Sequence, residues 1–502
     1  MPRMTLDSDA CWEAFAARDR RFEGRFVTAV VTTGIYCRPG CPAPLPRRRN
    51  IRFYACPAAA EEAGFRPCLR CRPDAAPGTP VWSGTSATVN RALRLIDEGA
   101  LDGSGIEPLA TRLGVTGRHL RRLFSQHLGA SPLAVARTRR VHFARRLIDG
   151  TRLPLGEVAV SAGFTNVRRF NHAIRETFRR APRDLRRVAT GGAAGPAGAA
   201  GAGELRLTLR ARAPFDGDAV LEFLAPRAIP GLEHVADGTY RRVVEVEGMR
   251  GTVAVTPRED GVDVAVRLPE PRDLIRVASR VTRLFELDAD PAPILAHLSR
   301  DATLARALGP RRDLRVPGAW DPFELAVRGI LGQQVSVRGA ATLAGRLVLG
   351  FGEPLANPEP GLTHSFPTPA RLARADLAKI GLPRARADAL NALAAEVAEG
   401  RLQFDQLGDL DQAVPRLTAL PGIGAWTAQY IAMRGLSEPD AFPAGDLGVV
   451  RALTRPGRKP AAGAIEARAE AWRPWRAYAV IALWTRPKNE TSTPSRNRRR
   501  KK

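Results

Sequence analysis

Two kinds of hydrophobic periodicity divide the chain. Between about residues 88 and 187, apolar residues recur at the spacing of one helix face, as at Leu109, Leu113 and Leu120. After residue 203 apolar and polar residues alternate, which is typical of half-buried strands. The alternating runs are LRLTLRARA, RRVVEVEG, GTVAVTP and VDVAVRL. The pattern therefore predicts an all-helical unit followed by a small antiparallel sheet.

Helical periodicity returns at about Arg272 and continues to Trp484, so the last large unit should be rich in helices. The segment TGGAAGPAGAAGAG separates the two patterned regions. It cannot bury an apolar face, and we expect it to act as a flexible spacer. A weaker break, rich in Pro and Gly, lies around residues 73–86. The polar, basic end TRPKNETSTPSRNRRRKK is expected to be disordered.

At 502 residues the chain is longer than one hydrophobic core usually organises. The patterns predict a multidomain α+β protein. The predicted segments are a small α+β unit of residues 1–78, an all-α unit of 84–188, a Gly/Ala linker of 189–203, the sheet unit of 204–280, the α-rich unit of 281–485 and a basic tail of 486–502.

The charge balance points to a polyanionic partner. The chain has 77 Lys and Arg residues against 51 Asp and Glu residues, a net charge of +26, and such an excess favours nucleic acid through phosphate neutralisation. No apolar run approaches the roughly 18 residues of a membrane span. The start, MPRMTLDSDACWEAF, has no basic-then-apolar signal pattern. We therefore expect a soluble cytoplasmic protein that binds DNA and no membrane.

Four of the six cysteines form two short-spaced pairs. Cys37 and Cys41 lie in TTGIYCRPGC, and Cys68 and Cys71 lie in GFRPCLRC. Two such pairs can close a tetrahedral site of four thiolates, which predicts one bound Zn²⁺. Spacing alone favours a purely structural zinc. The remaining two cysteines, Cys11 and Cys56, are expected to be inert buried thiols.

The strings TTGIYCRPGCPAP, RRRNIRFYA and AGFRPCLRCRPD resemble the N-terminal domain of the Ada adaptive-response family over about residues 5–75. The resemblance implies that the four cysteines bind the zinc and that Cys37 accepts a methyl group from a methylphosphotriester in DNA. The zinc would then be both structural and catalytic, because a zinc-bound thiol is deprotonated at neutral pH. Methylation would also remove negative charge close to DNA phosphates and so act as an electrostatic switch.

The same resemblance implies that Thr33 and Arg66 contact DNA. Two other contact positions differ, because Pro42 and Pro44 stand where the best-known member of the family has arginines. The basic triplet Arg47–Arg49 is a candidate replacement, although such a triplet can also be ordinary solvated surface.

Two strings in the helical region have parallel layouts: IEPLATRLGVTGRHLRRLFSQHLGASP and LPLGEVAVSAGFTNVRRFNHAIRETFRRAPRDLR. Each predicts a short apolar helix, a turn and a second helix with outward arginines, as in a helix-turn-helix unit. The second string resembles the signature of AraC-type regulators, which implies binding to promoter DNA and RNA polymerase as a partner. A generic helical bundle with solvated arginines is the alternative. The candidate base-reading residues are Arg118, His119, Arg122, Asn166, Arg168 and Arg169.

A glycine-rich hairpin and a carboxylate make the sharpest enzymatic signal. In LPGIG, Gly422 and Gly424 allow close approach of the backbone to a DNA phosphate at the start of a helix. Trp426 and Tyr430 are four residues apart and so share a helix face, where they could form an aromatic wall for an extruded base. Packing in a hydrophobic core is the alternative for both aromatic residues. Asp446 follows the hairpin by 22 residues.

With Pro443 and Gly445 before Asp446, this region resembles the helix-hairpin-helix superfamily of base-excision glycosylases. From about residue 204 to 484 the chain resembles the AlkA-type alkyladenine glycosylases. This resemblance implies that the small antiparallel-sheet domain packs on the α-rich helix-hairpin-helix domain. The resemblance implies that Asp446 is the catalytic carboxylate, that Trp484 is a third aromatic of the pocket, and that Gln334 stands where the best-known relative inserts a leucine into the duplex. The alternatives are that Asp446 only caps a helix, or that the unit binds DNA without catalysis.

Together the resemblances imply a two-part response to DNA alkylation. One part accepts methyl groups from methylphosphotriesters and activates transcription. The other removes 3-methyladenine and other alkylated bases from double-stranded DNA by base flipping and hydrolysis of the N-glycosidic bond. The Pro-Cys-His-Arg motif of guanine O6-methyltransferases does not occur in the sequence, so direct reversal of O6-methylguanine is not predicted.

Overall fold

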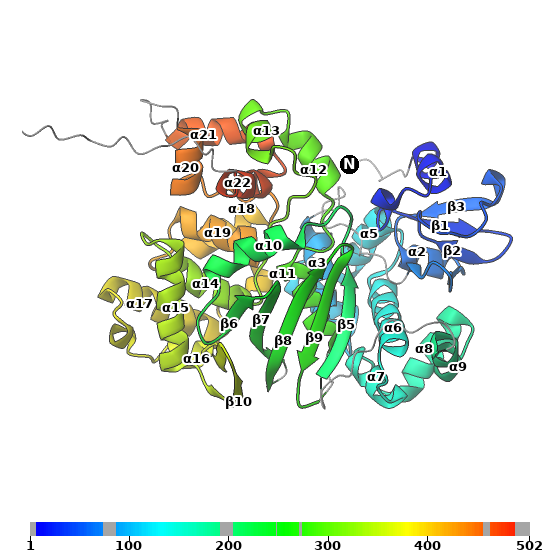
Figure 1. Ribbon diagram of the computed structural model, residues 1–502, viewed down its shortest axis with the longest axis horizontal. Helices are drawn as coiled ribbons and strands as arrows, with labels where there is room; N and C mark the ends of the chain where they lie inside the picture. Colours follow the sequence, from blue (N-terminus) through cyan, green and yellow to red (C-terminus); the bar gives the residue numbers. More distant parts are fainter. Residues whose placement is uncertain are drawn as a thin grey trace, which may run out of the picture.

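The computed structural model describes residues 7–73, 87–190, 204–246, 248–270, 274–454 and 462–486. The expected Gly/Ala linker and basic tail lie almost entirely outside the described residues. In Figure 1 the sheet of strands β5–β9 lies at the centre, with helices α14–α19 on one side and the N-terminal elements on the other. The expected fold class, a multidomain α+β protein, is confirmed.

The first segment is a small sheet with short helices. Its strand order is β3-β1-β2-β4, in which β1 pairs antiparallel with β2 and β3, and β2 pairs parallel with β4. Asp7 caps the first helix by accepting a hydrogen bond from the backbone N–H of Asp9 at 2.9 Å. The elements are α1 (Ser8–Ala16), η1 (Arg20–Phe22), β1 (Val27–Val30), β2 (Ile35–Cys37), η2 (Arg48–Asn50), β3 (Ile51–Tyr54), α2 (Pro57–Glu62) and β4 (Arg66–Pro67).

The second segment is all-helical where it is described, as the periodicity predicts. The second helix of each repeated unit begins at a side-chain cap: Thr116 accepts from the N–H of His119 at 3.2 Å, and Asn166 accepts from the N–H of Arg169 at 2.8 Å. The helices are α3 (Ala87–Asp97), α4 (Ile106–Arg112), α5 (Gly117–Leu128), α6 (Pro132–Gly150), α7 (Leu155–Ser161), α8 (Val167–Phe178) and α9 (Pro182–Thr190).

The third segment is a five-stranded antiparallel sheet of order β5-β9-β8-β7-β6. The four alternating runs of the sequence form β5 (Glu204–Arg210), β7 (Thr239–Val246), β8 (Met249–Arg258) and β9 (Gly261–Arg267). The edge strand β6 (Glu233–Ala236) was not predicted, because four residues give too little alternation. Helix α10 (Gly217–Leu224) and the 3₁₀ turn η4 (Ala225–Arg227) connect β5 to β6.

Where it is described, the fourth segment is helical except for one hairpin. Strands β10 (Pro354–Glu359) and β11 (Leu362–His364) interrupt the helices that the periodicity predicts there. The helices are α11 (Leu274–Leu284), α12 (Pro291–Leu298), α13 (Ala302–Leu308), α14 (Pro322–Leu331), α15 (Val337–Phe351), α16 (Pro369–Leu372), α17 (Arg384–Ala398), α18 (Leu410–Thr418), α19 (Ala425–Gly435), α20 (Leu447–Leu453), α21 (Ala462–Ala469) and α22 (Arg476–Trp484), with the 3₁₀ turns η5 (Leu377–Ile380), η6 (Phe404–Gln406) and η7 (Glu470–Trp472).

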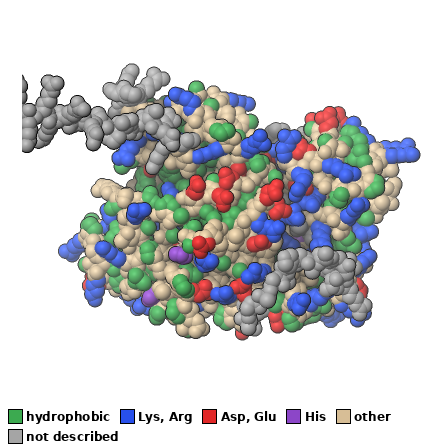
Figure 2. All heavy atoms as spheres, viewed as in Figure 1, with side chains coloured by type: hydrophobic (Ala, Val, Ile, Leu, Met, Phe, Trp, Pro, Cys, Tyr) green, Lys and Arg blue, Asp and Glu red, His purple; other side chains and the backbone are tan. Residues whose placement is uncertain are grey.

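The N-terminal and C-terminal halves meet along a charged seam. Arg25 contacts Asp290 at 2.5 Å, and the Nε of Arg112 donates to Asp405 at 2.8 Å. Two cavities of about 300 and 590 Å³ lie at this seam, where α3 faces the C-terminal half. On the face in Figure 2, Lys and Arg gather over the N-terminal elements. Among the described residues, no helix is long and apolar enough to cross a membrane.

Candidate functional sites

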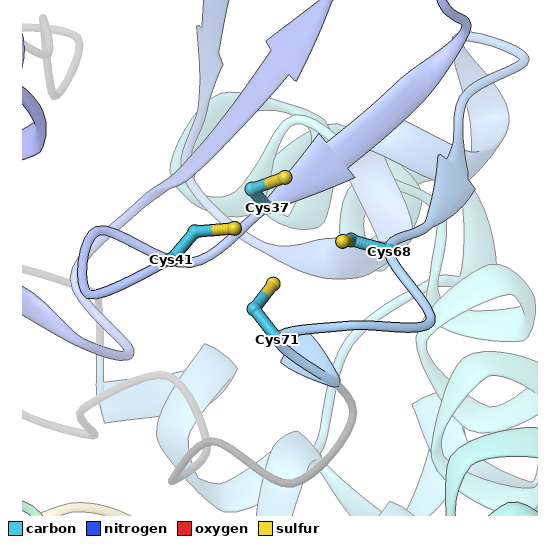
Figure 3. A group of neighbouring side chains, drawn as sticks. All are labelled: Cys37, Cys41, Cys68 and Cys71. Atoms are coloured by element: carbon cyan, nitrogen blue, oxygen red, sulfur yellow. The ribbon is translucent and has the colours of Figure 1, made fainter. Parts of the chain in front are cut away.

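The four paired cysteines meet at one end of the first sheet. Cys37 ends β2, and Cys68 follows β4, whose parallel pairing with β2 brings the two cysteine pairs together. The N–H of Cys68 donates to the carbonyl of Tyr36 at 2.9 Å. In Figure 3 the sulfur atoms of Cys37, Cys41, Cys68 and Cys71 point toward one another. All four side chains are buried, and their sulfur atoms lie within 4.8 Å of one another.

This arrangement fits zinc. A tetrahedral Zn²⁺ with Zn–S bonds of about 2.3 Å needs sulfur atoms about 3.8 Å apart, which the cluster can supply with little adjustment. The donor set of four thiols is also the soft set that zinc takes in closed sites. The chain therefore has a zinc site formed by the cysteines that the spacing predicts.

A buried polar network connects the strand of Cys37 to the helical segment. The hydroxyl of Tyr36 donates to Glu61 at 2.9 Å, His142 lies 2.8 Å from the same oxygen, and Thr138 donates to the other oxygen at 2.6 Å. Burial opposes ionisation of Glu61, but the interaction with His142 and these hydrogen bonds hold its pKa below the ordinary value. Because Tyr36 precedes Cys37, the network links the cluster to helix α6.

The predicted DNA contacts of the first segment lie on or beside the strands that position the cluster. Thr33 is exposed in the turn between β1 and β2, and Arg66 pairs with Ile35 on the adjacent strand. The triplet Arg47–Arg49 is also exposed. Cys11 and Cys56 are not among the four cysteines whose sulfur atoms meet. Cys11 is buried in the same small hydrophobic core as those four, whereas Cys56 is buried in the core of the helical segment. Burial raises the pKa of each of these two thiols to about 11.

The candidate base-reading residues lie at the starts of α5 and α8. His119 is half-buried, with its Nδ1 3.1 Å from the guanidinium of Arg122. Asn166 is the N-cap of α8, so its side-chain oxygen is already engaged. The other members of the set are exposed: Arg118, Arg122, Arg168 and Arg169.

The carboxylate of Asp446 is held by three N–H donors. Its Oδ1 accepts from the indole of Trp484 at 2.7 Å and from the backbone N–H of Val449 at 2.9 Å. Its Oδ2 accepts from the indole of Trp426 at 3.1 Å. Asp446 is thus the N-cap of α20, as expected for a carboxylate at a helix start. A helix cap requires only the bond from the backbone N–H. The two additional indole donors, which come from other helices, fix the plane of the carboxylate.

The three predicted aromatic residues form one cluster around this carboxylate. The rings of Trp426 and Tyr430 are stacked, with centroids 5.5 Å apart and planes at 6°. Trp484 lies 6.5 Å from Tyr430 at 48°. Trp472 and Trp475 are 1% and 9% exposed and belong to the core instead.

Sequence reasoning missed three residues of this cluster. Phe223 and Arg227 come from α10 and η4, and the ring of Phe223 stacks on Trp484 with centroids 6.4 Å apart. Arg434 donates to the hydroxyl of Tyr430 at 2.9 Å. Burial opposes ionisation of Tyr430, yet Arg434 and neighbouring arginines hold its pKa below the ordinary value. FLAPR, the string of Phe223 and Arg227, contains no motif, and only the tertiary fold brings it to Asp446.

The hairpin before α19 depends on its first glycine. Gly422 has φ of +75°, and a Cβ there would lie 2.4 Å from that of Ala389. Gly424 is the N-cap of α19. The side chain of Gln333 donates to the carbonyl of Gly422 at 2.8 Å, which ties the hairpin to the loop before α15. Gln334 follows with φ of +57° and is exposed, as a residue that enters DNA must be.

Four families match consecutive parts of the chain. They are the metal binding domain of Ada over residues 10–74, a helix-turn-helix domain over 109–188, the AlkA N-terminal domain over 206–321, and the HhH-GPD superfamily of base excision DNA repair proteins over 327–477. The resemblances that the sequence motifs predict are therefore confirmed.

Curated relatives match the two parts separately and together. DNA-3-methyladenine glycosylase 2 of Escherichia coli is 38% identical over 55% of this chain and 96% of its own. The bifunctional transcriptional activator/DNA repair enzyme Ada of Escherichia coli is 36% identical over 34% of this chain and 47% of its own. A probable bifunctional transcriptional activator/DNA repair enzyme AlkA of Mycobacterium tuberculosis is 45% identical over 95% of this chain and 96% of its own. Because that similarity extends over nearly the whole of both chains, this protein belongs to the family of bifunctional AlkA-type activators and DNA repair enzymes.

Proposed function

We propose that this protein responds to DNA alkylation at two separate sites, a methyl-accepting thiolate at Cys37 and a glycosylase site at Asp446. Its family membership and its Ada-type and HhH-GPD regions make it an alkylation-response activator and a 3-methyladenine DNA glycosylase. The observation that carries the residue assignment is the carboxylate of Asp446, held by Trp426, Trp484 and Val449 inside an aromatic cluster.

The geometry around Asp446 supports hydrolysis of an N-glycosidic bond. An extruded alkylated base would lie against the faces of Trp426, Tyr430 and Trp484, since electron-rich rings attract an electron-poor, cationic base. Alkylation at a ring nitrogen already weakens the bond to the sugar, so one carboxylate is enough. Asp446 would stabilise the oxocarbenium-like sugar and orient the attacking water. Its fixed plane means that the carboxylate need not reorganise during the reaction.

The hairpin and its neighbouring loop would hold the DNA. Gly422 and Gly424 would let the backbone approach a phosphate at the start of α19. Gln334 would fill the space left by the extruded base. Because a glutamine is less apolar than the leucine expected at this position, the range of lesions can differ from that of AlkA-type relatives.

Replacing Asp446 by Asn tests the assignment. Asp446→Asn keeps the size of the side chain and the oxygen that accepts from Val449, but it removes the charge. We expect release of 3-methyladenine from alkylated DNA to fall by on the order of 10²–10³-fold, with binding to the same DNA retained. Undiminished release of 3-methyladenine by Asp446→Asn would overturn the role of Asp446. If the parent protein bound alkylated DNA but released no base, the unit would be an inactive DNA-binding unit.

At the first site, the sulfur of Cys37 would attack the methyl carbon of a methylphosphotriester. The S–CH₃ bond forms as the CH₃–O bond breaks, and the phosphodiester leaves with the electron pair. When bound, one zinc ion keeps the thiols deprotonated while the sulfur atoms stay electron-rich, so the ion serves both structure and reactivity. Cys41, Cys68 and Cys71 would complete the cluster, and Thr33 and Arg66 would contact the DNA backbone.

Mapping the transferred methyl group tests Cys37 directly. The zinc-loaded protein is incubated with methylated DNA and digested, and the modified cysteine is identified by mass spectrometry. We expect the methyl group on Cys37. A methyl group on Cys41, Cys68 or Cys71 instead, or none on any of the four, would overturn the assignment, and Cys37→Ser should abolish the transfer.

The helical segment would convert methylation into transcription. We expect α5 and α8 to enter promoter DNA with Arg118, His119, Arg122, Asn166, Arg168 and Arg169, and RNA polymerase to be the further partner. Reduced thiols and a DNA substrate make the cytoplasm the proposed compartment. The proposed domains are residues 1–78, 84–188, 204–280 and 281–485, with a linker at 189–203 and a tail at 486–502. Footprinting with Arg168→Ala tests the contacts, and an unchanged footprint would contradict that assignment.

A further inference from the structure

Gln334 is a polar residue at a point of the structure that the proposed function places inside DNA. We propose that its side-chain amide hydrogen-bonds the orphan base, which is the base left without a partner when the lesion is extruded. The contact makes DNA binding depend on the hydrogen-bonding edge of the undamaged strand at that position. This inference rests on the proposed glycosylase site, and it adds a specificity-determining residue that reads the strand opposite the lesion.

The loop that presents Gln334 is fixed to the glycine-rich hairpin by the residue before it. The side chain of Gln333 donates to the carbonyl of Gly422 at 2.8 Å and to the hydroxyl of Thr427 at 3.0 Å. The carbonyl of Gln333 accepts from the guanidinium of Arg386 at 2.8 Å. The hairpin, α19 and α17 therefore all hold the backbone next to Gln334. Its position relative to the hairpin is set before DNA binds.

The side chain of Gln334 itself has no polar partner in the described part of the chain. It is exposed, and it takes part in none of the side-chain hydrogen bonds there. Its φ of +57° lies in the left-handed region, which glycine adopts more easily than glutamine does. No contact within the described residues therefore requires an amide at this position. The loop presents one acceptor oxygen and two N–H donors, all unengaged, beside the hairpin.

An amide that enters the duplex loses the water that satisfied it. An unpaired buried amide is costly, whereas an amide that finds partners is not. The bases above and below the vacated space present their flat faces, which are stacking surfaces. The orphan base presents the donors and acceptors that had paired with the lesion. Gln334 is therefore stabilised inside the duplex when it pairs with that edge.

A glutamine amide matches either pyrimidine, because its acceptor oxygen lies next to its donor N–H groups. Thymine offers the N3–H donor and the O4 acceptor, whereas cytosine offers the N4 amino donor and the N3 acceptor. Half a turn of the amide about its last bond exchanges the two pairings. Thymine opposite 3-methyladenine and cytosine opposite 7-methylguanine can therefore both be bound. The contact requires a pairing edge without excluding either natural partner.

Two valines of the same loop leave the amide available for this role. Val335 is 38% exposed, and Val337, the first residue of α15, is 45% exposed. Exposed apolar side chains at this place can contact the stacked neighbouring bases, as apolar wedges do. The apolar contacts with DNA do not then depend on Gln334. Its amide is left for the polar edge of the orphan base.

The test measures binding to a duplex that already lacks the lesion base. A tetrahydrofuran abasic analogue is placed opposite thymine, or opposite difluorotoluene, which has the shape of thymine but lacks its strong hydrogen-bonding groups. We expect the full-length protein to bind the thymine duplex about tenfold more tightly, because difluorotoluene leaves the amide unpaired. Gln334→Leu should lose this preference. All other DNA contacts are the same in the two duplexes, so they cancel in the ratio of the two Kd values.

Gln412→Leu is the matched control for loss of an exposed glutamine, since Gln412 is exposed on α18. This variant should keep the preference of the parent protein. Equal binding of the parent protein to the thymine and difluorotoluene duplexes would overturn the inference without the use of any variant. An unchanged preference in Gln334→Leu would also overturn it, because the contact would then belong to another residue.

Failure of the glycosylase proposal gives a different result. The parent protein would then bind the abasic duplex no more tightly than a fully paired duplex of the same sequence, and it would release no 3-methyladenine. Release of 3-methyladenine together with equal binding to the two orphan bases would overturn the role of Gln334 alone.

Discussion

Trp484 donates its indole N–H to Oδ1 of Asp446 at 2.7 Å, across 38 residues of sequence. The donor is the last residue of α22, and the acceptor is the N-cap of α20. The two helices pack against each other, so the position of the carboxylate depends on the last helix of the α-rich segment. Trp484 therefore orients Asp446 as well as offering a ring face to the base.

The two roles of Trp484 can be separated. Trp484→Phe keeps an aromatic face but removes the N–H that donates to the carboxylate. Since hydrogen bonds to charged groups contribute about 1.5–3 kcal/mol, we expect kcat for 7-methylguanine release to fall roughly 10- to 100-fold. KM should change little, because an aromatic face remains. Single-turnover base release measures the effect.

Trp472→Phe is the matched control, because it also removes an indole N–H from a carboxylate. Trp472 donates to Asp301 at 3.1 Å, and Asp301 caps α13, away from Asp446. This variant should lose thermal stability while kcat stays close to that of the parent. If Trp484→Phe released bases at the parental rate, the hydrogen bond to Asp446 would have no part in catalysis.

Gly448 leaves room for this contact. A Cβ at Gly448 would lie 2.8 Å from Cδ1 of Trp484 and 2.9 Å from Oδ1 of Asp446. We expect Gly448→Ala to displace one of the two side chains and to lower base release at least tenfold. Alanine usually stabilises a helix by about 1 kcal/mol relative to glycine, so the loss should not come from weaker α20. Gly445→Ala is the control, because a Cβ there meets nothing within 4 Å. Equal activity in the two variants would contradict the prediction.

The sequence predicts the local part of each site well and the long-range part poorly. Cysteine spacing identifies all four members of the zinc cluster, because each pair lies within one turn of the chain. The spacing of Trp426 and Tyr430 likewise predicts their shared face. Helix periodicity predicts α3 to α9, but the strands β6 and β11 contain too few residues for alternation to stand out. Strand β10 has no buried side chain along its six residues and contains two prolines, so it shows no alternation.

Phe223 and Arg227 illustrate what periodicity and motif leave out. They lie more than 200 residues before Asp446, in a helix and turn that cover the sheet. Their contact with Trp484 depends on how the sheet segment packs on the α-rich segment, which no local pattern records. The same holds for the charged seam, where Arg112 and Asp405 come from different halves of the chain.

Glu286 should make stability depend on pH. Burial raises the pKa of this carboxyl to about 8, and it accepts hydrogen bonds from Tyr478 and Val316 at 2.6 Å each. The folded state therefore holds a proton that the unfolded chain releases near pH 4.5. The proton on Glu286 contributes its full stabilisation to the folded state below about pH 4.5, and this contribution is lost as the pH rises toward 8. Since one pKa unit corresponds to about 1.4 kcal/mol, the rise of the pKa from 4.5 to about 8 corresponds to a loss of at most about 5 kcal/mol.

Chemical denaturation at several pH values between about 5 and about 8 measures this change in the free energy of unfolding. Glu286→Gln cannot titrate, so its free energy of unfolding should vary less with pH, whatever its absolute value. Glu222→Gln, at an exposed position of α10, is the control and should keep the parental slope. A parental slope in Glu286→Gln would show that Glu286 is ionised in the folded protein.

The seam between the halves should hold them together without a covalent link. A protease site in the Gly/Ala segment allows the full-length protein to be cut after folding, and we expect the two parts to co-elute at low salt. Arg112→Asp places two acids opposite each other where Nε of Arg112 now donates to Asp405 at 2.8 Å. Loss of a partly exposed ion pair costs up to about 1 kcal/mol, and the repulsion between the two acids adds to this cost, so the Kd of the parts should rise roughly fivefold or more. The double variant Arg112→Asp with Asp405→Arg should restore it. Arg121→Asp is the control, because Arg121 pairs with Glu107 inside the helical segment. Separate elution of the cut parent protein, or no rescue by the double variant, would show that the seam does not join the halves through this pair.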